Sequence, residues 1–402
     1  MRLNPFRSRG ARMVKATGPA LQGRFDVTLF AACAALLVIG TLLVASTTGR
    51  PHLGLDGSDA LYQLKHQGIM VIVGGVLFVL AVAAPMRWIE IASKLLLPVS
   101  VVLLIAVLAV GEQRLGARRW FSIGPVTIQT SEIAKVAFAM YLAGYLQKRR
   151  TVLNDLLVGI VPMGVMFVMV ALLIGVQPDV GSVVLLAALV ASMLVVGGTR
   201  LTYLGLVVLG LALAVLLFIL AQPEKIARFV GWLIPEATRL GEGYHIYNSQ
   251  ILIGTGGLAG VGLGEGVYHQ LGYLPQSAND FIFSVASEEL GFIGVACIVA
   301  LYAAIGVRGL AIARMCKDDF SRFGAFALTL LLTLPALVHM AVDMGLMPTK
   351  GLVCPFLSNG GSAMAAAMGT LGLLQRFHLE ATAEPVPCEV TFQPATATEG
   401  AA

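Results

Sequence analysis

The sequence has few charged residues, which make up 12% of its 402 positions, about half the ~25% usual in soluble domains. Hydrophobic residues make up 57%, so too few polar side chains remain to cover a soluble surface. The five cysteines form no C-x-x-C pair, so neither a zinc site nor a disulfide framework is indicated. The net charge of +5 is too small to indicate a nucleic-acid partner. These shortages exclude a soluble enzyme, a fibrous protein and a disordered chain, and predict a polytopic membrane protein.

Long windows without Asp, Glu, Lys or Arg predict the membrane-spanning helices, because ~20 apolar residues cross the hydrocarbon core. The windows are 27–49, 67–86, 95–111, 156–178, 180–199, 201–223, 290–307, 323–342, 351–375 and a shorter one, 136–147. The shorter window is long enough if Ser131 to Lys135 form its first turn. In the last window the first ten residues read as a loop, with the span near 361–376. The expected fold is therefore an all-α polytopic membrane protein with about ten transmembrane helices.

The distribution of charge predicts the orientation. With the N-terminus inside, the cytoplasmic segments carry more basic than acidic residues and the outer segments the reverse, as the positive-inside rule requires. Three parts follow: a basic cytoplasmic segment at 1–25, a membrane domain at 26–376 and a disordered cytoplasmic tail at 377–402. The membrane domain includes a large extracytoplasmic loop at 223–282, between the seventh and eighth helices.

Polar and charged side chains beside the apolar windows are costly there and indicate function. They form four clusters: Arg118, Arg119 and Trp120 with Glu132 and Lys135; Gln177 with Asp179; Asp280 with Glu288 and Glu289; and Asp343 with Lys350 and Ser358. All four map to the outer face under one topology. An ion carrier would instead place its charges across the bilayer midplane. The pattern predicts an outward-facing chamber at the membrane surface, reached by a lipid-embedded substrate.

A run of seven glycines between residues 254 and 266 invites comparison with a nucleotide-binding loop. No strand precedes it and no G-K-[ST] follows, so the nucleotide interpretation is rejected. Glycine permits backbone conformations that other residues avoid, and a pliable loop is expected here.

Several motifs occur in a fixed order along the chain: G-A-R-R-W, Q-x-S-E-x-x-K, Q-P-D-x-G, Y-L-P-x-x-x-x-D-F-I-F with E-E-L-G, and P-T-K-G before S-x-G-G-S. By these motifs the chain resembles the SEDS family, which includes RodA, FtsW and SpoVE, from about residue 26 to 376. Tyr273-Leu274-Pro275 and Met347 to Gly351 resemble the FtsW division branch more than the RodA elongation branch.

The chain also departs from the family pattern at several positions. Thr130 stands where proline is usual, and Ser277-Ala278-Asn279 precedes the aspartate in place of Ala/Ser-His-Thr. Asp343 stands where asparagine is usual, and Asn359 where tyrosine is usual. These changes touch the expected site, so they bear on substrate detail and on the level of activity.

The resemblance implies a peptidoglycan glycosyltransferase in the bacterial cytoplasmic (inner) membrane, with both termini cytoplasmic. It would polymerise lipid II, an undecaprenyl-pyrophosphate disaccharide-pentapeptide, at the outer face during cell division. Its partners would be a class B penicillin-binding protein transpeptidase and other divisome membrane proteins. The alternatives are a RodA-like elongation polymerase, a non-catalytic scaffold and a lipid II flippase. A divalent cation, Mg²⁺ or Mn²⁺, would suit pyrophosphate departure, but no spacing in the sequence assigns metal ligands, and no organic cofactor is expected.

Asp280 is the candidate catalytic base. It lies at the mouth of an apolar helix, where desolvation raises a carboxyl pKa toward a useful value. The alternative is an N-cap, a common role for aspartate before a helix. The resemblance favours the catalytic role, because the corresponding aspartate is the family's catalytic residue.

The candidate substrate-binding residues have alternative roles too. Arg118 and Arg119 suit pyrophosphate, because guanidinium groups match phosphate oxygens, yet with Trp120 they also suit an interfacial anchor. Glu132 and Lys135 resemble positions that the family needs for activity, and their i,i+3 spacing also fits a structural ion pair. The predicted set is completed by Gln177, Asp179, Lys350 and Ser358.

Overall fold

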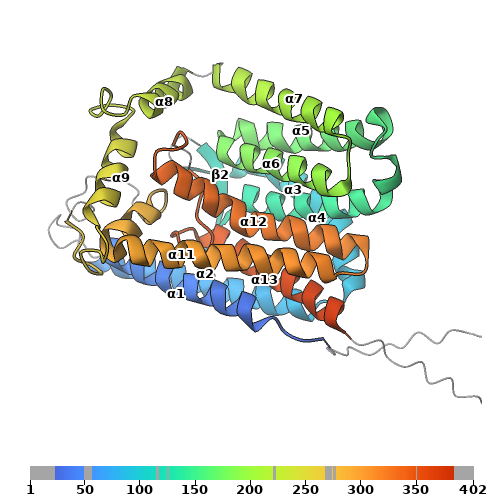
Figure 1. Cartoon of the computed structure of the whole chain (residues 1–402), viewed down its shortest axis with the longest axis horizontal. Helices are drawn as coiled ribbons and strands as arrows, with labels where there is room; N and C mark the ends of the chain where they lie inside the picture. Colours follow the sequence, from blue (N-terminus) through green and yellow to red (C-terminus); the bar gives the residue numbers. More distant parts are fainter. Residues whose placement is uncertain are drawn as a thin grey trace, which may run out of the picture.

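The computed structural model describes residues 23–48, 57–114, 117–124, 126–220, 223–267, 274, 278–349 and 351–383. Most of them are helical (Figure 1). The elements are α1 (Val27–Thr48), α2 (Gly57–Ala83), α3 (Met86–Val110), β1 (Glu112–Arg114), β2 (Ala117–Ile123), β3 (Val126–Gln129), α4 (Thr130–Arg149), η2 (Arg150–Val152), η3 (Leu156–Ile160), α5 (Val161–Val176), α6 (Val180–Gly197), α7 (Leu201–Leu220), α8 (Pro223–Leu233), α9 (Tyr244–Thr255), α11 (Ile282–Met315), α12 (Asp319–Asp343) and α13 (Gly361–Thr382).

Among the described residues, seven segments are long and apolar enough to cross a membrane. They lie in α1, α2, α3, η3 with α5, α6, α11 and α12. Their outward sides are apolar, as Leu95, Val99 and Val102 of α3 illustrate with at least half of each side chain exposed. This pattern is typical of helices that face lipid, and the chain is a mostly helical multi-pass membrane protein. Helices α4, α7 and α13 occupy the other three predicted windows, and the count of ten crossings stays a prediction.

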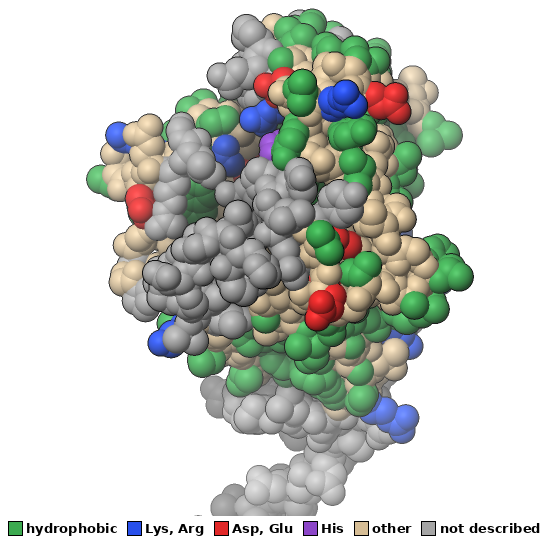
Figure 2. Space-filling view, turned by 90° about the vertical axis from the view of Figure 1, so that its left-hand side faces the viewer, with side chains coloured by type: hydrophobic (Ala, Val, Ile, Leu, Met, Phe, Trp, Pro, Cys, Tyr) green, Lys and Arg blue, Asp and Glu red, His purple; other side chains and the backbone are tan. Residues whose placement is uncertain are grey.

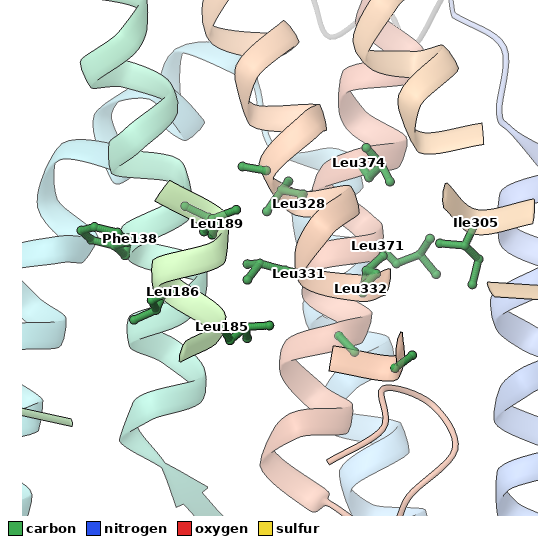
Figure 3. Packing of buried hydrophobic residues seen from close by; sticks show 14 of the residues in the cluster. Phe138, Leu185, Leu186, Leu189, Ile305, Leu328, Leu331, Leu332, Leu371 and Leu374 are labelled. Atoms are coloured by element: carbon green, nitrogen blue, oxygen red, sulfur yellow. The ribbon is translucent and has the colours of Figure 1, made fainter. Parts of the chain in front are cut away.

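The long helices pack side by side around α12, which contacts α11, α4, α13 and α6. Figure 3 shows leucines of α6, α12 and α13 meeting Phe138 of α4 and Ile305 of α11 in the core. Lipid is as apolar as these side chains, so close packing, more than exclusion from water, holds such helices together. The close approach of α13 to α2 depends on Gly372, where a Cβ would come within 2.6 Å of the Phe78 carbonyl oxygen.

The expectation of a wholly helical chain was wrong in one region. Residues 112–129 form a three-stranded antiparallel sheet in the order β1-β2-β3, with Trp120 opposite Gln129. The strands have three, seven and four residues, which is too short for a clear alternating pattern. The sheet joins the end of α3 to the start of α4. It therefore caps the end of the bundle that was predicted to face outward (Figure 1).

The long segment 223–282 contains two helices, α8 and α9, in its described parts. The indole Nε1 of Trp232, on α8, donates a hydrogen bond of 2.8 Å to the Gly345 carbonyl oxygen just after α12. Ser249 of α9 donates one of 2.7 Å to the carbonyl oxygen of Asp343. Both helices are thereby fixed to the same end of the bundle as the sheet.

The glycine run docks onto a break in α11. Gly291 has a φ of 65°, which interrupts a helix that starts eight residues before the predicted window 290–307. The run crosses this break: the Val261 amide donates to the Glu288 carbonyl, and the Phe292 amide donates to the Gly257 carbonyl. Glu288 and Glu289, predicted to belong to the polar cluster of Asp280, are buried beside this break.

The end of the membrane domain differs from the predicted boundary at residue 376. Helix α13 continues to Thr382 because Phe377 and Leu379 are buried, and Phe377 meets Phe320 of α12 edge to face. The rest of the predicted tail, from residue 384, and residues 1–22 of the predicted basic segment lie outside the described residues.

Candidate active site

Asp280 lies directly before α11, at the end of the molecule that carries the sheet. Its side chain is half-buried, and both carboxylate oxygens would lie 3.9 Å from a Cβ placed on Gly351. Burial raises the pKa of Asp280 to about 6, while the nearby charges of Arg119 and Arg228 act to lower it. The carboxylate is therefore mostly ionised at neutral pH, with a basicity that suits proton transfer.

The N-cap of α11 is Phe281, which makes no capping side-chain bond, and Asp280 does not supply one either. The cap comes from another helix, since the Asp343 Oδ2 accepts hydrogen bonds from the amide (3.1 Å) and the hydroxyl (3.2 Å) of Ser284. Asp343 takes the capping role, and the Asp280 carboxylate has no hydrogen-bond partner among the described residues.

Asp343 belongs to a buried polar network that joins four segments. Ser249 of α9 lies 2.5 Å from the Ser284 hydroxyl of α11, oxygen to oxygen. His339, one turn before Asp343 on α12, places its Nε2 3.6 Å from the Asp343 carboxylate. Its Nδ1 lies 2.7 Å from the carbonyl oxygen of Leu352, next to Gly351. The network therefore holds the loop after α12 against the start of α11, around Asp280.

Strand β2 brings two arginines to this end of the bundle. Arg119 donates a hydrogen bond of 3.1 Å to the Pro178 carbonyl oxygen, and its guanidinium lies 5.8 Å from the centre of the Trp120 ring. The Arg118 side chain is exposed. Figure 2 faces this end of the molecule and shows Lys or Arg side chains close to a histidine. The site thus combines a half-buried carboxylate with cations that suit phosphate.

Glu132 and Lys135 form an ion pair of 2.7 Å, with side chains only 12% and 10% exposed. They line a cavity of about 30 Å³ between α4, α6, α12, α13 and the loop after α12. Leu185, Leu331 and Leu332, labelled in Figure 3, form part of its wall. The predicted pair is present and borders a cavity, so its structural and functional interpretations are compatible.

Three predicted substrate-binding residues are engaged by the chain itself. Gln177 is buried and donates to the Leu104 carbonyl oxygen at 3.2 Å. Asp179 caps α6 and accepts a hydrogen bond from Ser131 at 3.0 Å. The Ser358 hydroxyl accepts from the Cys354 amide at 3.1 Å, within one turn. These contacts position α4, α6 and the loop, and they leave binding by these side chains a prediction. Lys350 lies outside the described residues.

Three polar residues of this region were not predicted from the sequence: Arg228, His245 and His339. The positive charge of Arg228, on α8, acts to lower the pKa of Asp280. The His245 ring of α9 stacks on the Phe281 ring, with centroids 5.7 Å apart. Burial lowers the pKa of His245, and the charge of Arg228 adds to this effect. The i,i+4 spacing of His339 and Asp343 on one helix face is a sequence signal that predicts contact between these two side chains.

The described residues include no group of three His, Cys, Asp or Glu side chains that could hold a metal ion. A preformed cation cage therefore does not fit the described part of the site. Mg²⁺ often binds largely through substrate phosphates, so a cation that enters with the substrate stays a prediction.

Comparisons with known proteins identify the family. The model of the FtsW/RodA/SpoVE cell cycle proteins matches residues 27–383. The chain belongs to this family. It is 34% identical to the probable peptidoglycan glycosyltransferase FtsW of Idiomarina loihiensis, over 90% of this chain and 88% of that protein. It is 36% identical to the protein of the same name from Thioalkalivibrio sulfidiphilus, over 92% and 93%.

Solved structures share the fold of this FtsW/RodA/SpoVE protein. A chain of a peptidoglycan synthase complex, studied for how polymerisation and crosslinking are coordinated, superposes with a TM-score of 0.73 and 27% identity, covering 90% of this chain and 99% of that one. The rod shape determining protein RodA of Thermus thermophilus gives a TM-score of 0.64 and 26% identity, covering 88% and 96%.

Proposed function

We propose that this chain is a peptidoglycan glycosyltransferase that polymerises lipid II at the outer face of the bacterial cytoplasmic membrane, in an FtsW-like division role. The observation that carries the proposal is the Asp280 carboxylate. This carboxylate is half-buried, does not cap α11, and has a pKa of about 6 with two arginines nearby. The chain that carries it is similar to proteins named FtsW along most of its length.

The reaction joins two sugars and releases a lipid pyrophosphate. The acceptor 4-hydroxyl attacks the anomeric carbon of the donor sugar, and the bond from that carbon to the pyrophosphate oxygen breaks. Asp280 accepts the proton of the hydroxyl as the new glycosidic bond forms. Arg118, Arg119 and Lys350 would offset the negative charge on the leaving pyrophosphate. A divalent cation carried by the pyrophosphate would supply further charge stabilisation.

The proposed topology has ten crossings, in which α4, α7 and α13 join the seven apolar segments. Both termini are then cytoplasmic, and the sheet, α8, α9 and Asp280 face outward. The excess of Lys and Arg in the segments at the opposite end supports this orientation. A lipid II headgroup would reach Asp280 from the outer leaflet, and a class B penicillin-binding protein with other divisome proteins would lie beside the chain.

The test is polymerisation of labelled lipid II by the purified protein, with and without a cognate class B penicillin-binding protein, in Mg²⁺ or Mn²⁺. Glycan ladders on a gel are expected from the wild type and none from Asp280→Asn. Glu265→Gln is the matched control, because Glu265 is an exposed carboxylate on the same outer segment. Ladders from Asp280→Asn would disprove its role as the base. Absence of ladders from the wild type with its partner would favour the scaffold alternative.

A further inference from the structure

A larger cavity lies at the opposite end of the bundle from Asp280. Its volume is about 350 Å³, and it lies where α3 begins, α4 ends and α12 begins. Its lining residues are Glu90, Ser93, Lys94, Tyr141, Gly144, Tyr145, Gln147, Lys148, Arg149 and Phe320. This volume falls in the range of small-ligand sites, roughly 300–1,000 Å³. The proposed glycosyltransferase reaction uses none of these residues.

The wall of this cavity carries three basic side chains and one acidic one. Lys94 and Lys148 form no ion pair within the described part of the chain, and both side chains are exposed. Nearby basic residues behave differently, since Arg150 and Arg322 share the Asp319 carboxylate at 2.9 and 3.2 Å. The cavity therefore holds positive charge that the described residues do not neutralise, which favours an anionic ligand.

Two tyrosines and Arg149 shape the cavity. The Tyr145 hydroxyl donates to the Gly159 carbonyl oxygen at 2.9 Å, and Arg149 donates to the Val158 carbonyl oxygen at 2.8 Å. The Arg149 guanidinium lies 5.7 Å from the centre of the Tyr145 ring, so it is held in place. The Tyr141 ring packs against that of Tyr145 at a tilt of 38°, with ring centroids 6.0 Å apart. Its hydroxyl has no hydrogen-bond partner among the described residues. The Tyr141 hydroxyl is thus available to a ligand.

The cavity extends from the end of the bundle into it. Lys94 is eight residues from the start of α3, and Tyr141 is eight residues from the end of α4. Eight helical residues span about 12 Å. The polar lining therefore extends about 12 Å into the bundle from its end.

We propose that this cavity binds the headgroup of an anionic phospholipid of the inner leaflet. Lys94, Lys148 and Arg149 would neutralise the lipid phosphate, while the Tyr141 hydroxyl would donate a hydrogen bond to it. Basic pockets between membrane helices on the cytoplasmic side are sites where such headgroups bind. The choice of leaflet rests on the proposed orientation, and the site is separate from the one around Asp280.

The test is native mass spectrometry of the full-length protein in detergent, titrated with phosphatidylglycerol or, for comparison, phosphatidylcholine. Inorganic phosphate and glycerol 3-phosphate, which lack acyl chains, are added as competitors. The test variant is Lys94→Gln with Lys148→Gln. The matched control is Arg314→Gln with Lys317→Gln, because both residues are exposed basic residues at the same end of the bundle and outside the cavity.

We expect phosphatidylglycerol to bind at least tenfold more tightly than phosphatidylcholine, and the cavity variant to lose most of this preference. The control should change the preference less than twofold, and Tyr141→Phe should weaken it severalfold without removing a charge. Equal losses in cavity and control variants would overturn the proposal in favour of diffuse charge. If inorganic phosphate competes at the same concentration as phosphatidylglycerol, the proposal is overturned in favour of a soluble phosphate ligand.

Discussion

Two aspartates stand in the same local sequence context, yet the fold uses them in opposite ways. Asp26 and Asp280 each lie at the start of a long apolar helix, α1 and α11. The Asp26 carboxylate accepts hydrogen bonds from the Leu29 amide and the Arg308 guanidinium, both at 2.9 Å. Burial acts to raise its pKa, but the hydrogen bonds and the charge of Arg308 outweigh this effect, so the pKa is lowered.

Asp280 has no hydrogen-bond partner of either kind in the part of the chain that the structure describes, and the charges of Arg119 and Arg228 offset its burial only in part. Burial dominates there and raises its pKa to about 6. The difference shows that a carboxylate before a helix has a structural role when it caps that helix and pairs with a cation. It stays available for chemistry when a different residue caps the helix. In this protein Asp343 takes it.

The largest expected contrast is in catalysis. Asp280→Asn should reduce the rate of lipid II polymerisation by at least ~100-fold, because a positioned base contributes about 10²–10⁴-fold. Its thermal unfolding temperature should stay within the error of wild type, since no hydrogen bond among the described residues is lost. A fluorescence melting curve beside the ladder assay checks both. A large drop in melting temperature would show that Asp280 is structural like Asp26.

The converse change is Arg308→Gln at the other end. It leaves the buried Asp26 carboxylate without its cation, so the free energy of unfolding should fall by about 3 kcal/mol. This value is at the low end for breaking a buried ion pair, because the Arg308 side chain is partly exposed. Polymerisation per folded molecule should be unchanged. Thermal unfolding in detergent and the specific activity of the folded fraction give the two readouts. An unchanged melting temperature would mean that the Asp26 pair contributes nothing to stability.

A smaller effect is expected at Asp343. Asp343→Ala removes the acceptor for the Ser284 amide and hydroxyl, and leaving such buried donors unpaired costs about 1–3 kcal/mol. The start of α11 should then move, which lowers kcat through the position of Asp280. Asp343→Asn keeps an oxygen acceptor and should restore both stability and rate. If the asparagine variant is as impaired as the alanine variant, the charge of Asp343 matters beyond its cap.

The smallest effect concerns the pH profile. A base with a pKa near 6 must be ionised, so polymerisation should fall as the pH drops through about 6. Arg228 acts to lower that pKa, so Arg228→Gln should raise it and move the acid limb of the profile to higher pH. The rate at pH 6 should fall a few-fold, and the rate at pH 8 should change little. An acid limb that stays in place would show that Arg228 does not act on Asp280.

The boundaries of several helices were predictable because apolar windows report on them directly. The windows 156–178 and 180–199 correspond to η3 with α5 and to α6, within two residues at each end. The start of α4 at Thr130 agrees with the prediction that Ser131 to Lys135 form a first turn. The sheet at 112–129 was missed, because short strands satisfy their backbone only by pairing with each other.

The location of the candidate site residues can be compared with the sequence prediction, while their roles stay predictions. The sequence placed four polar clusters at one end, and the structure joins them through contacts such as Ser131 with Asp179 and Ala278 with Asn359. The capping role of Asp343, the engagement of Gln177 and the proximity of Arg228 to Asp280 were not predictable. Each depends on a partner at least 50 residues away in the sequence, and periodicity carries no information on such pairs.

The sequence by itself determined that this chain lies in a membrane, where several of its helices begin and end, and which family it resembles. These properties depend on local composition, since a helix satisfies its backbone within its own segment. Only the tertiary structure decided which carboxylates are neutralised. The partner of Asp26 is 282 residues away and the cap of α11 comes from α12. A charge in a medium of low dielectric responds to its nearest neighbours in space, and folding alone sets which residues those are.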